Sequence, residues 1–476
     1  MIAKALQFHE QEAVIAGAQS AVGKGLLLLV GVAALSWHEI GPLMIGSFVL
    51  VMFFPERRRS LLMLAGFGWI AATYLGRQGI ELLHVVQSLD TVEPGRWFRF
   101  FVQSLAATGM ILTVIFAAIR FDALPGFVRR HPLLILHLLV WLAVDMSAMP
   151  YLSMLGIAPF FLWRASYLVK SAARGNTAGT SLQDHMFYMA PVFGGPHTPF
   201  GKGLDYLNRY EATTLESIAR SQLAGIKLLL LAMVWTVVLV FMSAVIFGYE
   251  DTFLAAVFAS WSLELPHLAE IMLAETEHSI AVLWSAVYLE LVRMTLNLAI
   301  YGHVIIGCLR LLGFNVFRNT YKPLRAESIV EFWNRYFYYF KELLVDFFFY
   351  PTFLRCTWAG PRLRLCLAAF AAAFVGNMYL HIISNPGLLV QGQLSVLWTT
   401  WGPRSIYCFL LALGIWLSML RQQRRRKLAV QSSGVQTIRA IAGVWTFYAL
   451  INIWNVTPRD IGFSERWRFM LSLLGI

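Results

Sequence analysis

The sequence predicts an all-α integral membrane protein that crosses the bilayer many times. Of its 476 residues, 58% are hydrophobic and only 13% are charged, and the mean hydropathy is +0.63. These values lie well outside those of soluble globular proteins. Soluble multidomain architectures are therefore set aside, and we expect a single polytopic membrane domain over residues 1–476.

Apolar runs long enough to cross a bilayer, or nearly so, recur along the whole chain. They lie at 23–37, 41–54, 60–76, 99–119, 132–149, 151–169, 223–248, 280–313, 363–384, 404–420 and 436–456, with weaker cases near 253–274 and 466–476. About ten to twelve transmembrane helices are expected from these runs. We divide the domain into N-terminal helices (1–170), a cytoplasmic insert (171–222), a core (223–460) and a C-terminal segment (461–476).

The net charge of +12 is distributed in clusters beside the apolar runs. Arg57–Arg59 follow one run, Arg129 and Arg130 precede another, and Arg421–Lys427 separate two of the last. Counting the runs places these clusters on one face, which the positive-inside rule makes cytoplasmic. We interpret them as topology determinants, not as phosphate-binding patches, and expect no nucleic-acid partner. Because Met1–Gln19 is polar and mixed in charge, no cleavable signal peptide is expected, and the N-terminus is predicted to be cytoplasmic.

A polar stretch of roughly fifty residues interrupts the apolar pattern, which is too long for a simple loop. It separates the run ending near Lys170 from the one beginning near Ala224 and includes Gly194-Gly195-Pro196. Thr213 or Thr214 precedes Glu216 as an N-cap. This stretch is predicted to be a structured cytoplasmic insert.

The sequence supports neither a disulfide framework nor a metal site. Cys308, Cys356, Cys366 and Cys408 have no CxxC spacing and lie in or beside apolar runs, which is typical of packing residues. Glu264, His267 and Glu270 have helical spacing, but no fourth ligand accompanies them, so a solvated helix face is expected. Glu290 and Arg293 lie three residues apart and predict an ion pair inside a membrane helix, with cavity lining as the alternative.

The stretch from Cys308 to Pro351 contains the largest group of specific polar and aromatic residues. Ser328 and Glu331 form a capping-box pattern, so a helix is predicted to begin there. The segment from Phe332 to Phe353 is rich in aromatic residues but too charged to cross lipid freely, which suits a re-entrant or interfacial helix beside a protein-enclosed cavity. The side chains expected to face that cavity are Asn334, Arg335, Tyr338, Lys341, Glu342 and Asp346.

This stretch resembles the core signature of the membrane-bound O-acyltransferase (MBOAT) family. The matching residues are Gly307–Phe314 (GCLRLLGF), Asn319, Pro323, Ser328-Ile329, Phe332-Trp333, Arg335, Asp346 and Tyr350-Pro351. In the bacterial branch, which includes alginate O-acetylation proteins and the D-alanyl transfer protein of teichoic acid synthesis, the signature reads approximately LLGF, N, RP, S, FWRRWH, RDY and IP. Gly195-Pro196 and Gly225-Ile226-Lys227 resemble two further landmarks, so the resemblance covers about residues 180–460.

The chain departs from the signature at the first family histidine and in the residues around the second. FWNRYF places Phe337 where the bacterial branch has its first histidine, and a phenyl ring cannot transfer a proton. His381, in GNMYLHI, matches the second and more general histidine, although the family context is LSGLWHG-like. The resemblance therefore implies His381 as the general base, a role for which imidazole is suited near neutral pH. A neutral core histidine bonded to a backbone carbonyl is the structural alternative.

The resemblance also suggests roles for residues near Phe337. Some eukaryotic branches place an asparagine after a tryptophan at the first histidine position, and Trp333-Asn334 offers that pair. The register set by Asp346 and Pro351, however, aligns Phe337 with the histidine and puts Asn334 one helical turn earlier. Asn334 is expected to orient a substrate carbonyl or stabilise an oxyanion, with a structural hydrogen bond to a nearby helix end as the alternative. Substrate-binding roles are expected for Trp333, Arg335, Tyr338 and Asp346.

A function follows from the resemblance as an expectation. It implies an MBOAT-like bundle with re-entrant helices around a central cavity, in the cell inner membrane. An acyl group would pass from a thioester donor, acyl-CoA or an acyl-carrier protein, to a hydroxyl of a glycan, lipid or small molecule. No organic cofactor or metal is expected, because the thioester already activates the acyl group. Bacterial members often work with a pathway partner protein, which is left open. The alternative is a catalytically inactive relative that acts as a scaffold or conduit for a lipid or glycan.

Overall fold

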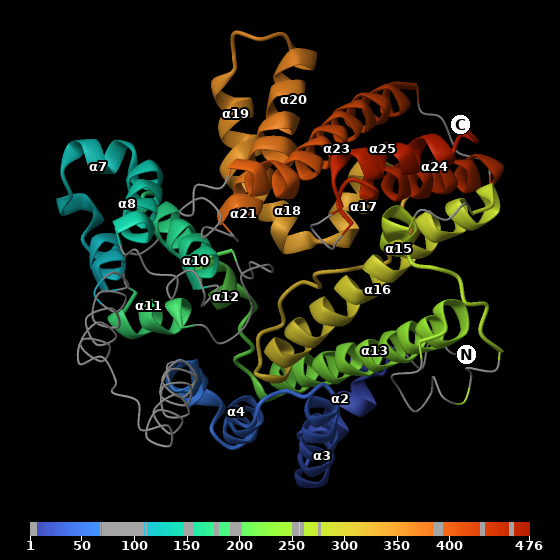
Figure 1. Cartoon of the computed structure of the whole chain (residues 1–476). Coiled ribbons are helices and arrows are strands. Elements are labelled where there is room, and N and C mark those ends of the chain that lie inside the picture. The colour runs from blue at the N-terminus through green and yellow to red at the C-terminus, as the bar shows by residue number, and fades with distance from the viewer. Residues whose placement is uncertain are drawn as a thin grey trace, which may run out of the picture. The chain divides into compact units, whose positions relative to one another are not determined.

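In the computed structural model, the chain forms helices joined by turns (Figure 1). The structure describes residues 7–66, 68, 109, 112–146, 157–175, 180–190, 202–249, 257, 261–274, 278–383, 394–428, 434–456 and 461–476. No β-strand occurs within these ranges, which contain one isolated bridge between Glu211 and Phe314. The described residues divide into two compact units: residues 1–227 with 307–316, and residues 228–306 with 317–476.

Four helices in the described ranges are long and apolar enough to cross a membrane. They are α13 (Leu215–Phe247), α16 (Ile280–Leu311), the continuous helix Pro361–Ile383, and Trp398–Arg424 within α23 (Leu394–Leu428). These helices match the predicted runs at 223–248, 280–313, 363–384 and 404–420. Helices of membrane-spanning length and hydropathy are therefore present at four of the predicted runs.

The N-terminal residues add a fifth candidate span if a bent pair is counted as one. Helices α2 (Glu12–Gln19) and α3 (Ala21–Trp37) meet at an angle of 95°. Ser20 lies at the bend and caps α3 by accepting a hydrogen bond from the Gly23 amide at 3.0 Å. The apolar helices α4 (Pro42–Phe53) and Pro132–Trp141, within α8 (Pro132–Met146), are shorter.

Other predicted spans differ or lie partly outside the described ranges. The run at 436–456 forms a helix, α24 (Gly434–Asn452), but it is not among those apolar enough to span. The runs at 60–76, 99–119, 151–169 and 253–274 fall partly outside the described residues. The total of ten to twelve spans stays a prediction.

The predicted polar insert is structured where it is described. It contains α11 (Leu182–Met189) and α12 (Leu204–Tyr210), while Gly194-Gly195-Pro196 lie outside the described residues. Ser181 and Asp184 form a capping box at the start of α11. The hydroxyl of Thr214 accepts a hydrogen bond from the Ser217 amide at 3.2 Å, which confirms Thr214 as the N-cap of α13.

Arg58 is buried in the first unit and joins segments that are far apart in the sequence. Its guanidinium donates to the carbonyl oxygens of Pro55, Ala212 and Gly313, at 2.9, 2.5 and 3.3 Å. Its Nε also lies 3.3 Å from a carboxylate oxygen of Glu211. A buried backbone carbonyl without a hydrogen-bond partner is costly. Arg58 therefore supplies donors to carbonyls of both segments, 211–213 and 313–315, where they contact each other.

The neighbouring Arg59 extends this contact into an ion-pair network. It pairs with Glu211 and with Asp184, the latter at 2.5 Å, and donates to the Asn208 side chain at 2.9 Å. Burial raises the pKa of Asp184, but hydrogen bonds from Ser181 and Arg59 outweigh burial and hold that pKa below its usual value. Sequence analysis interpreted Arg57–Arg59 as topology determinants. The structure adds that Arg58 and Arg59 form hydrogen bonds and ion pairs with other segments of the first unit, whereas Arg57 is exposed.

The second unit contains the helices after α16 (Figure 1). They are α17 (Ile329–Tyr336), α18 (Tyr338–Leu344), α19 (Tyr350–Arg355), α20 (Pro361–Phe370), α21 (Asn377–Ile383), α23, α24 and α25 (Phe463–Ser472). Helix α23 packs along α20 and contacts α17 and α24. On α16, Arg293 donates two hydrogen bonds to the buried Glu290, at 2.8 and 2.6 Å, which confirms the predicted ion pair.

Replacing Arg58 tests its place in the first unit. Arg58→Met is expected to lower the free energy of unfolding by roughly 3 kcal/mol, because the Ala212 carbonyl loses the arginine donor and Glu211 loses one of its two cations, while the Gly313 carbonyl keeps only the Ala212 amide. Arg57→Met removes the same charge from the exposed neighbour and should change stability little. Thermal unfolding of both variants in one detergent measures the difference, and equal melting temperatures would contradict the role of Arg58.

Candidate functional site

The predicted helix over Phe332–Phe353 is interrupted at Phe337. Helix α17 ends at Tyr336 and α18 begins at Tyr338, while Phe337 has φ −141° and ψ 76°, outside the helical region. The predicted N-terminal cap is present in part: the Ser328 hydroxyl accepts from the Glu331 amide at 3.2 Å. The Glu331 carboxylate, however, accepts from the Glu327 amide at 2.7 Å, not from Ser328.

The loop Asn319–Tyr321 supplies the backbone partners that this break requires. The Tyr321 amide donates to the carbonyl of Arg335 at 2.7 Å, and the Thr320 hydroxyl donates to that of Tyr336 at 3.0 Å. On the other side of the break, the Tyr338 amide donates to the Asn319 carbonyl at 2.9 Å. The Tyr339 amide donates to the Asn319 side chain at 3.3 Å. The two helix ends, which otherwise leave backbone groups unpaired, are thus satisfied by one loop.

A small cavity lies in the second unit beside α17. Its volume is about 60 Å³. The lining residues come from α17, α18, α20, α23 and the two π-helical turns that follow α18 and α20, η6 (Val345–Phe349) and η7 (Ala371–Gly376). They are Val330, Trp333, Asn334, Lys341, Leu344, Val345, Phe349, Ala369, Ala372, Ala373, Ile415 and Met419. Three of the lining residues are alanines, whose small side chains leave this space open.

The two π-helical turns pack against each other next to the cavity. A side chain added at Gly376 of η7 would meet Phe348 and Leu344, with its Cβ 2.8 Å from the Phe348 ring. Glycine is therefore required for this close approach. Single π-helical turns within α-helices are found frequently at functional sites, so their location here supports the cavity as the candidate site.

The polar groups of the cavity are few. Asn334 is exposed, which places it at the mouth, and the buried ring of Trp333 forms one wall. The Lys341 ammonium pairs with Glu342 and lies 5.0 Å from the centre of the Tyr338 ring. An amide and an ammonium group beside an apolar space are able to donate hydrogen bonds to a carbonyl oxygen or an oxyanion.

The other predicted binding residues lie near the cavity but do not line it. Arg335 forms an ion pair with Glu331 at 2.5 Å and lies 3.4 Å from the Arg325 carbonyl. Tyr338 packs edge-on against Phe317. Asp346 lies on η6, between lining residues Val345 and Phe349. Phe337 packs against Phe340, with ring centres 5.2 Å apart.

His381 is on α21 and is not among the lining residues. It follows Ala373 by eight residues on the continuous helix Pro361–Ile383. At 1.5 Å per residue, this spacing separates the two by about 12 Å along the axis. The structure therefore brings Trp333, Asn334 and Lys341 to one cavity and leaves His381 further along one of its walls.

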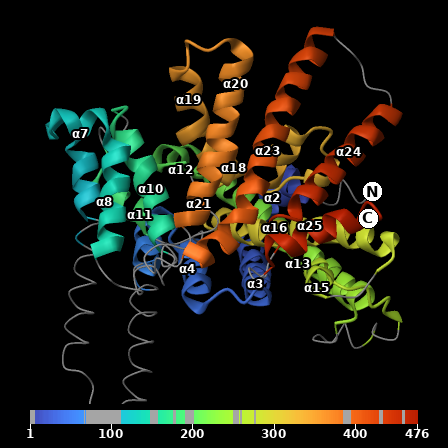
Figure 2. The same ribbon diagram turned by 45° about the horizontal axis from the view of Figure 1, so that its top comes forward.

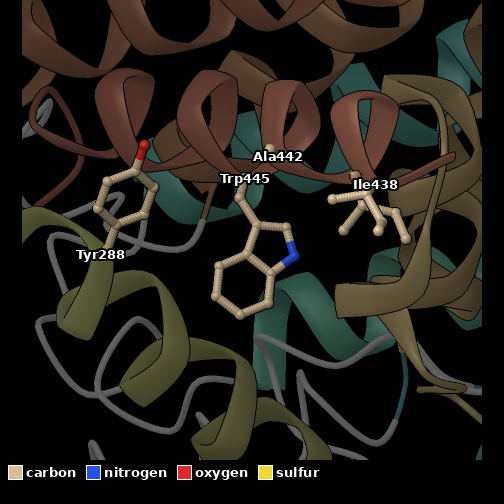
Figure 3. A pocket seen from close by; sticks show the side chains of 5 residues that line it. Tyr288, Ile438, Ala442 and Trp445 are labelled. Atoms are coloured by element: carbon tan, nitrogen blue, oxygen red, sulfur yellow. The ribbon is translucent and has the colours of Figure 1, made fainter. Parts of the chain in front are cut away.

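A second hollow in this unit is apolar and contains no group for chemistry. It measures about 360 Å³ and is lined by Tyr288 of α16 and by Ile438, Ile441, Ala442 and Trp445 of α24 (Figure 3). The Tyr288 hydroxyl lies 2.7 Å from that of Thr446, and the indole N–H of Trp445 donates to the Leu324 carbonyl at 2.8 Å. The Tyr288 hydroxyl and the Trp445 indole N–H thus both have hydrogen-bond partners within the protein.

The described residues contain no group of side chains able to hold a metal ion. His267 is half-buried between Phe247 and Tyr249, with ring centres 3.8 and 5.0 Å apart, and its amide donates to Glu270 at 2.8 Å. Burial lowers the pKa of His267, against the opposing charge of Glu270. All four cysteines are free thiols, and Cys308 and Cys408 are buried, as expected for packing residues.

Five lining residues of the cavity were not predicted from the sequence: Ala369, Ala372, Ala373, Ile415 and Met419. Ala369, Ala372 and Ala373 lie in LAAFAAAF, a run of small residues that indicates close helix packing. Ile415 and Met419 carry no comparable signal, because nothing local distinguishes them from other apolar residues of α23.

No model of a known protein family matches the chain, and no curated protein sequence is significantly similar to it.

Replacing Asn319 tests the loop that joins α17 to α18. Asn319→Ala is expected to lower the free energy of unfolding by roughly 1 kcal/mol, since the Tyr339 amide loses its side-chain acceptor. Asn319→Asp keeps an acceptor and should retain most of the stability. Asn315→Ala changes an exposed asparagine and is the control. Thermal unfolding in detergent measures all three, and an Asn319→Ala variant as stable as the control would contradict this role.

Proposed function

We propose that the chain is an integral membrane O-acyltransferase of the MBOAT type, which transfers an acyl group from a thioester to a hydroxyl. One observation carries the proposal: Trp333, a residue of the resembling signature, and its neighbour Asn334 line one cavity together with Lys341. Two candidate membrane helices, Pro361–Ile383 and Trp398–Arg424, supply other walls of that cavity. A reaction site at membrane depth is expected to be lined in this way, with polar groups that face a protein-enclosed space.

In this proposal, the acceptor hydroxyl attacks the thioester carbonyl carbon. His381 takes the hydroxyl proton, the new C–O bond forms, and the carbonyl oxygen becomes an oxyanion. The Asn334 amide and the Lys341 ammonium donate hydrogen bonds to that oxyanion. When the intermediate collapses, the C–S bond breaks and the thiolate leaves with the proton that His381 held. No cofactor takes part.

The finer architecture is also proposed. The helices form an MBOAT-like bundle with its cavity reached from the cytoplasm by acyl-CoA or an acyl-carrier protein, in the cell inner membrane. The hydroxyl acceptor is a glycan, lipid or small molecule. A cavity of about 60 Å³ holds a few water-sized groups, because one water requires about 10–15 Å³ by this measure. A short acyl group therefore fits without rearrangement of the walls.

A second candidate function is a catalytically inactive relative that acts as a scaffold or conduit for a lipid or glycan. Two observations favour it. Phe337 has no proton to transfer and serves as the residue at a helix break, and His381 lies outside the lining of the cavity.

Replacing His381 separates the two candidates. His381→Ala is expected to lower acyl transfer by roughly 10²–10⁴-fold, which is typical for loss of a general base. His131→Ala changes an exposed histidine in the other unit and should retain full activity. Product mass is measured in cells with matched protein levels. Full acylation by the His381 variant would exclude this residue as the base, and no acylated product from the wild type would favour the inactive relative.

Filling the cavity tests where the acyl group binds. Ala373→Val adds two methyl groups to a lining residue and is expected to reduce turnover at least tenfold with little loss of stability. Ala371→Val places the same change on the same π-helical turn, at a residue that does not line the cavity. Equal turnover by the two variants would indicate that the acyl group binds elsewhere.

A further inference from the structure

The turn between α19 and α20 exposes both arginine side chains and large apolar side chains. It projects from the second unit as the end of a helical hairpin, orange in both views (Figures 1 and 2). Large apolar side chains are exposed there: Trp358 is 75% exposed, Leu354 64% and Leu363 49%. Arg355 and Arg362 are exposed between them. We define residues 354–363 as the α19–α20 tip.

The tip is a compact turn within the hairpin. Arg364 donates to the Phe353 carbonyl, and its guanidinium lies 4.0 Å from the centre of the Phe353 ring. The Cys356 amide donates to the Thr352 carbonyl at 3.0 Å, and the Ala359 amide donates to the Cys356 carbonyl at 3.2 Å. Arg364 therefore stabilises the hairpin through its contacts with Phe353. Arg355 and Arg362 are the arginines that remain exposed at the tip.

The tip lies at one end of a candidate membrane helix. That helix begins at Pro361, within the tip itself. Helix α23 packs alongside α20, and the indole N–H of Trp416 donates to the Arg362 carbonyl at 3.3 Å. The end of α23 that carries Arg421 and Arg424 thus lies on the same side as the tip (Figure 2).

The charge of this region has one sign. From residue 347 to residue 459 the sequence contains no aspartate or glutamate. Among the described residues, Arg355 and Arg362 form no ion pair. A cationic surface that also exposes tryptophan and leucine at the end of a membrane helix matches the bilayer interface, where aromatic rings lie at headgroup level and anionic headgroups attract arginine.

We propose that the α19–α20 tip is a binding surface for anionic phospholipid headgroups, with Arg355 and Arg362 on the phosphates and Trp358 inserted at headgroup depth. The basic end of α23 places the tip at the cytoplasmic leaflet under the positive-inside rule. A protein partner would need acidic groups to reach the two arginines and would leave the apolar ring of Trp358 beside the lipid. The proposal does not depend on acyl transfer.

Lipid binding to the full chain tests the proposal directly. Detergent-solubilised protein is titrated with phosphatidylglycerol or phosphatidylcholine, and bound lipids are counted by native mass spectrometry. The wild type should prefer phosphatidylglycerol. Arg355→Gln/Arg362→Gln should weaken its binding roughly thirty-fold, about five-fold for each arginine. Arg209→Gln/Arg220→Gln removes two charges from the first unit and is the matched control. Equal binding by both double variants would overturn the proposal, as would a wild type without lipid preference.

A second measurement locates the tip without changing its charge. Cys356 lies in the tip and is half-buried, and Cys308 and Cys408 are buried. With Cys366→Ser in the background, a fluorophore on Cys356 reports from the tip in reconstituted vesicles. Lipids that carry a spin label at the headgroup should quench it more strongly than lipids labelled at the end of an acyl chain. Absence of quenching by either lipid would place the tip in water or against protein and would contradict the proposal.

Discussion

Backbone N–H and C=O groups at helix ends need hydrogen-bond partners within the protein wherever apolar residues exclude water. The rest of this structure depends on that requirement. In the first unit, Arg58 donates to three carbonyl oxygens from separate segments, and Arg310 donates twice to Val316. In the second, Arg466 donates to the carbonyls of Ile453, Val456 and Ile461. A guanidinium has five donors in fixed directions, so one buried arginine replaces several waters. Charged residues that composition alone assigns to the surface are thereby made part of the core.

The same requirement shapes the candidate site. The chain between Tyr336 and Tyr338 leaves the helix, and the loop Asn319–Tyr321 pairs the groups that this exposes. Asn319, a residue of the resembling signature, therefore has a structural role in this chain. The break redirects α18, which brings Lys341 to the cavity that Trp333 and Asn334 line. Phe337, where the bacterial signature has a histidine, packs against Phe340 at the break. Hydrogen-bond donors are thus gathered at the cavity, while the imidazole of His381 lies further along α21.

One helix connects the features to which we assign function. The continuous helix from Pro361 to Ile383 begins in the basic tip, passes the cavity at Ala369–Ala373, and ends just beyond His381. Its middle is a π-helical turn that packs closely on η6 at Gly376. Headgroup binding at the tip would fix the depth of this helix in the bilayer, and with it the depth of the cavity. Acyl transfer additionally requires His381 to come within hydrogen-bond reach of the acceptor hydroxyl at the cavity.

Features that depend on near neighbours in the sequence were determined by the sequence itself. Hydropathy located the four candidate membrane helices, three-residue spacing located the Glu290–Arg293 pair, and cap patterns located Thr214 and, in part, Ser328. Tertiary structure decided the rest. The burial of Arg58 depends on carbonyls more than 150 residues away, the break at Phe337 on the loop that pairs with it, and the cavity on alanines and α23 residues from another part of the chain. Local patterns encode helix formation because its hydrogen bonds join residues four apart, whereas burial and cavity shape are set by contacts between segments that the sequence does not place together.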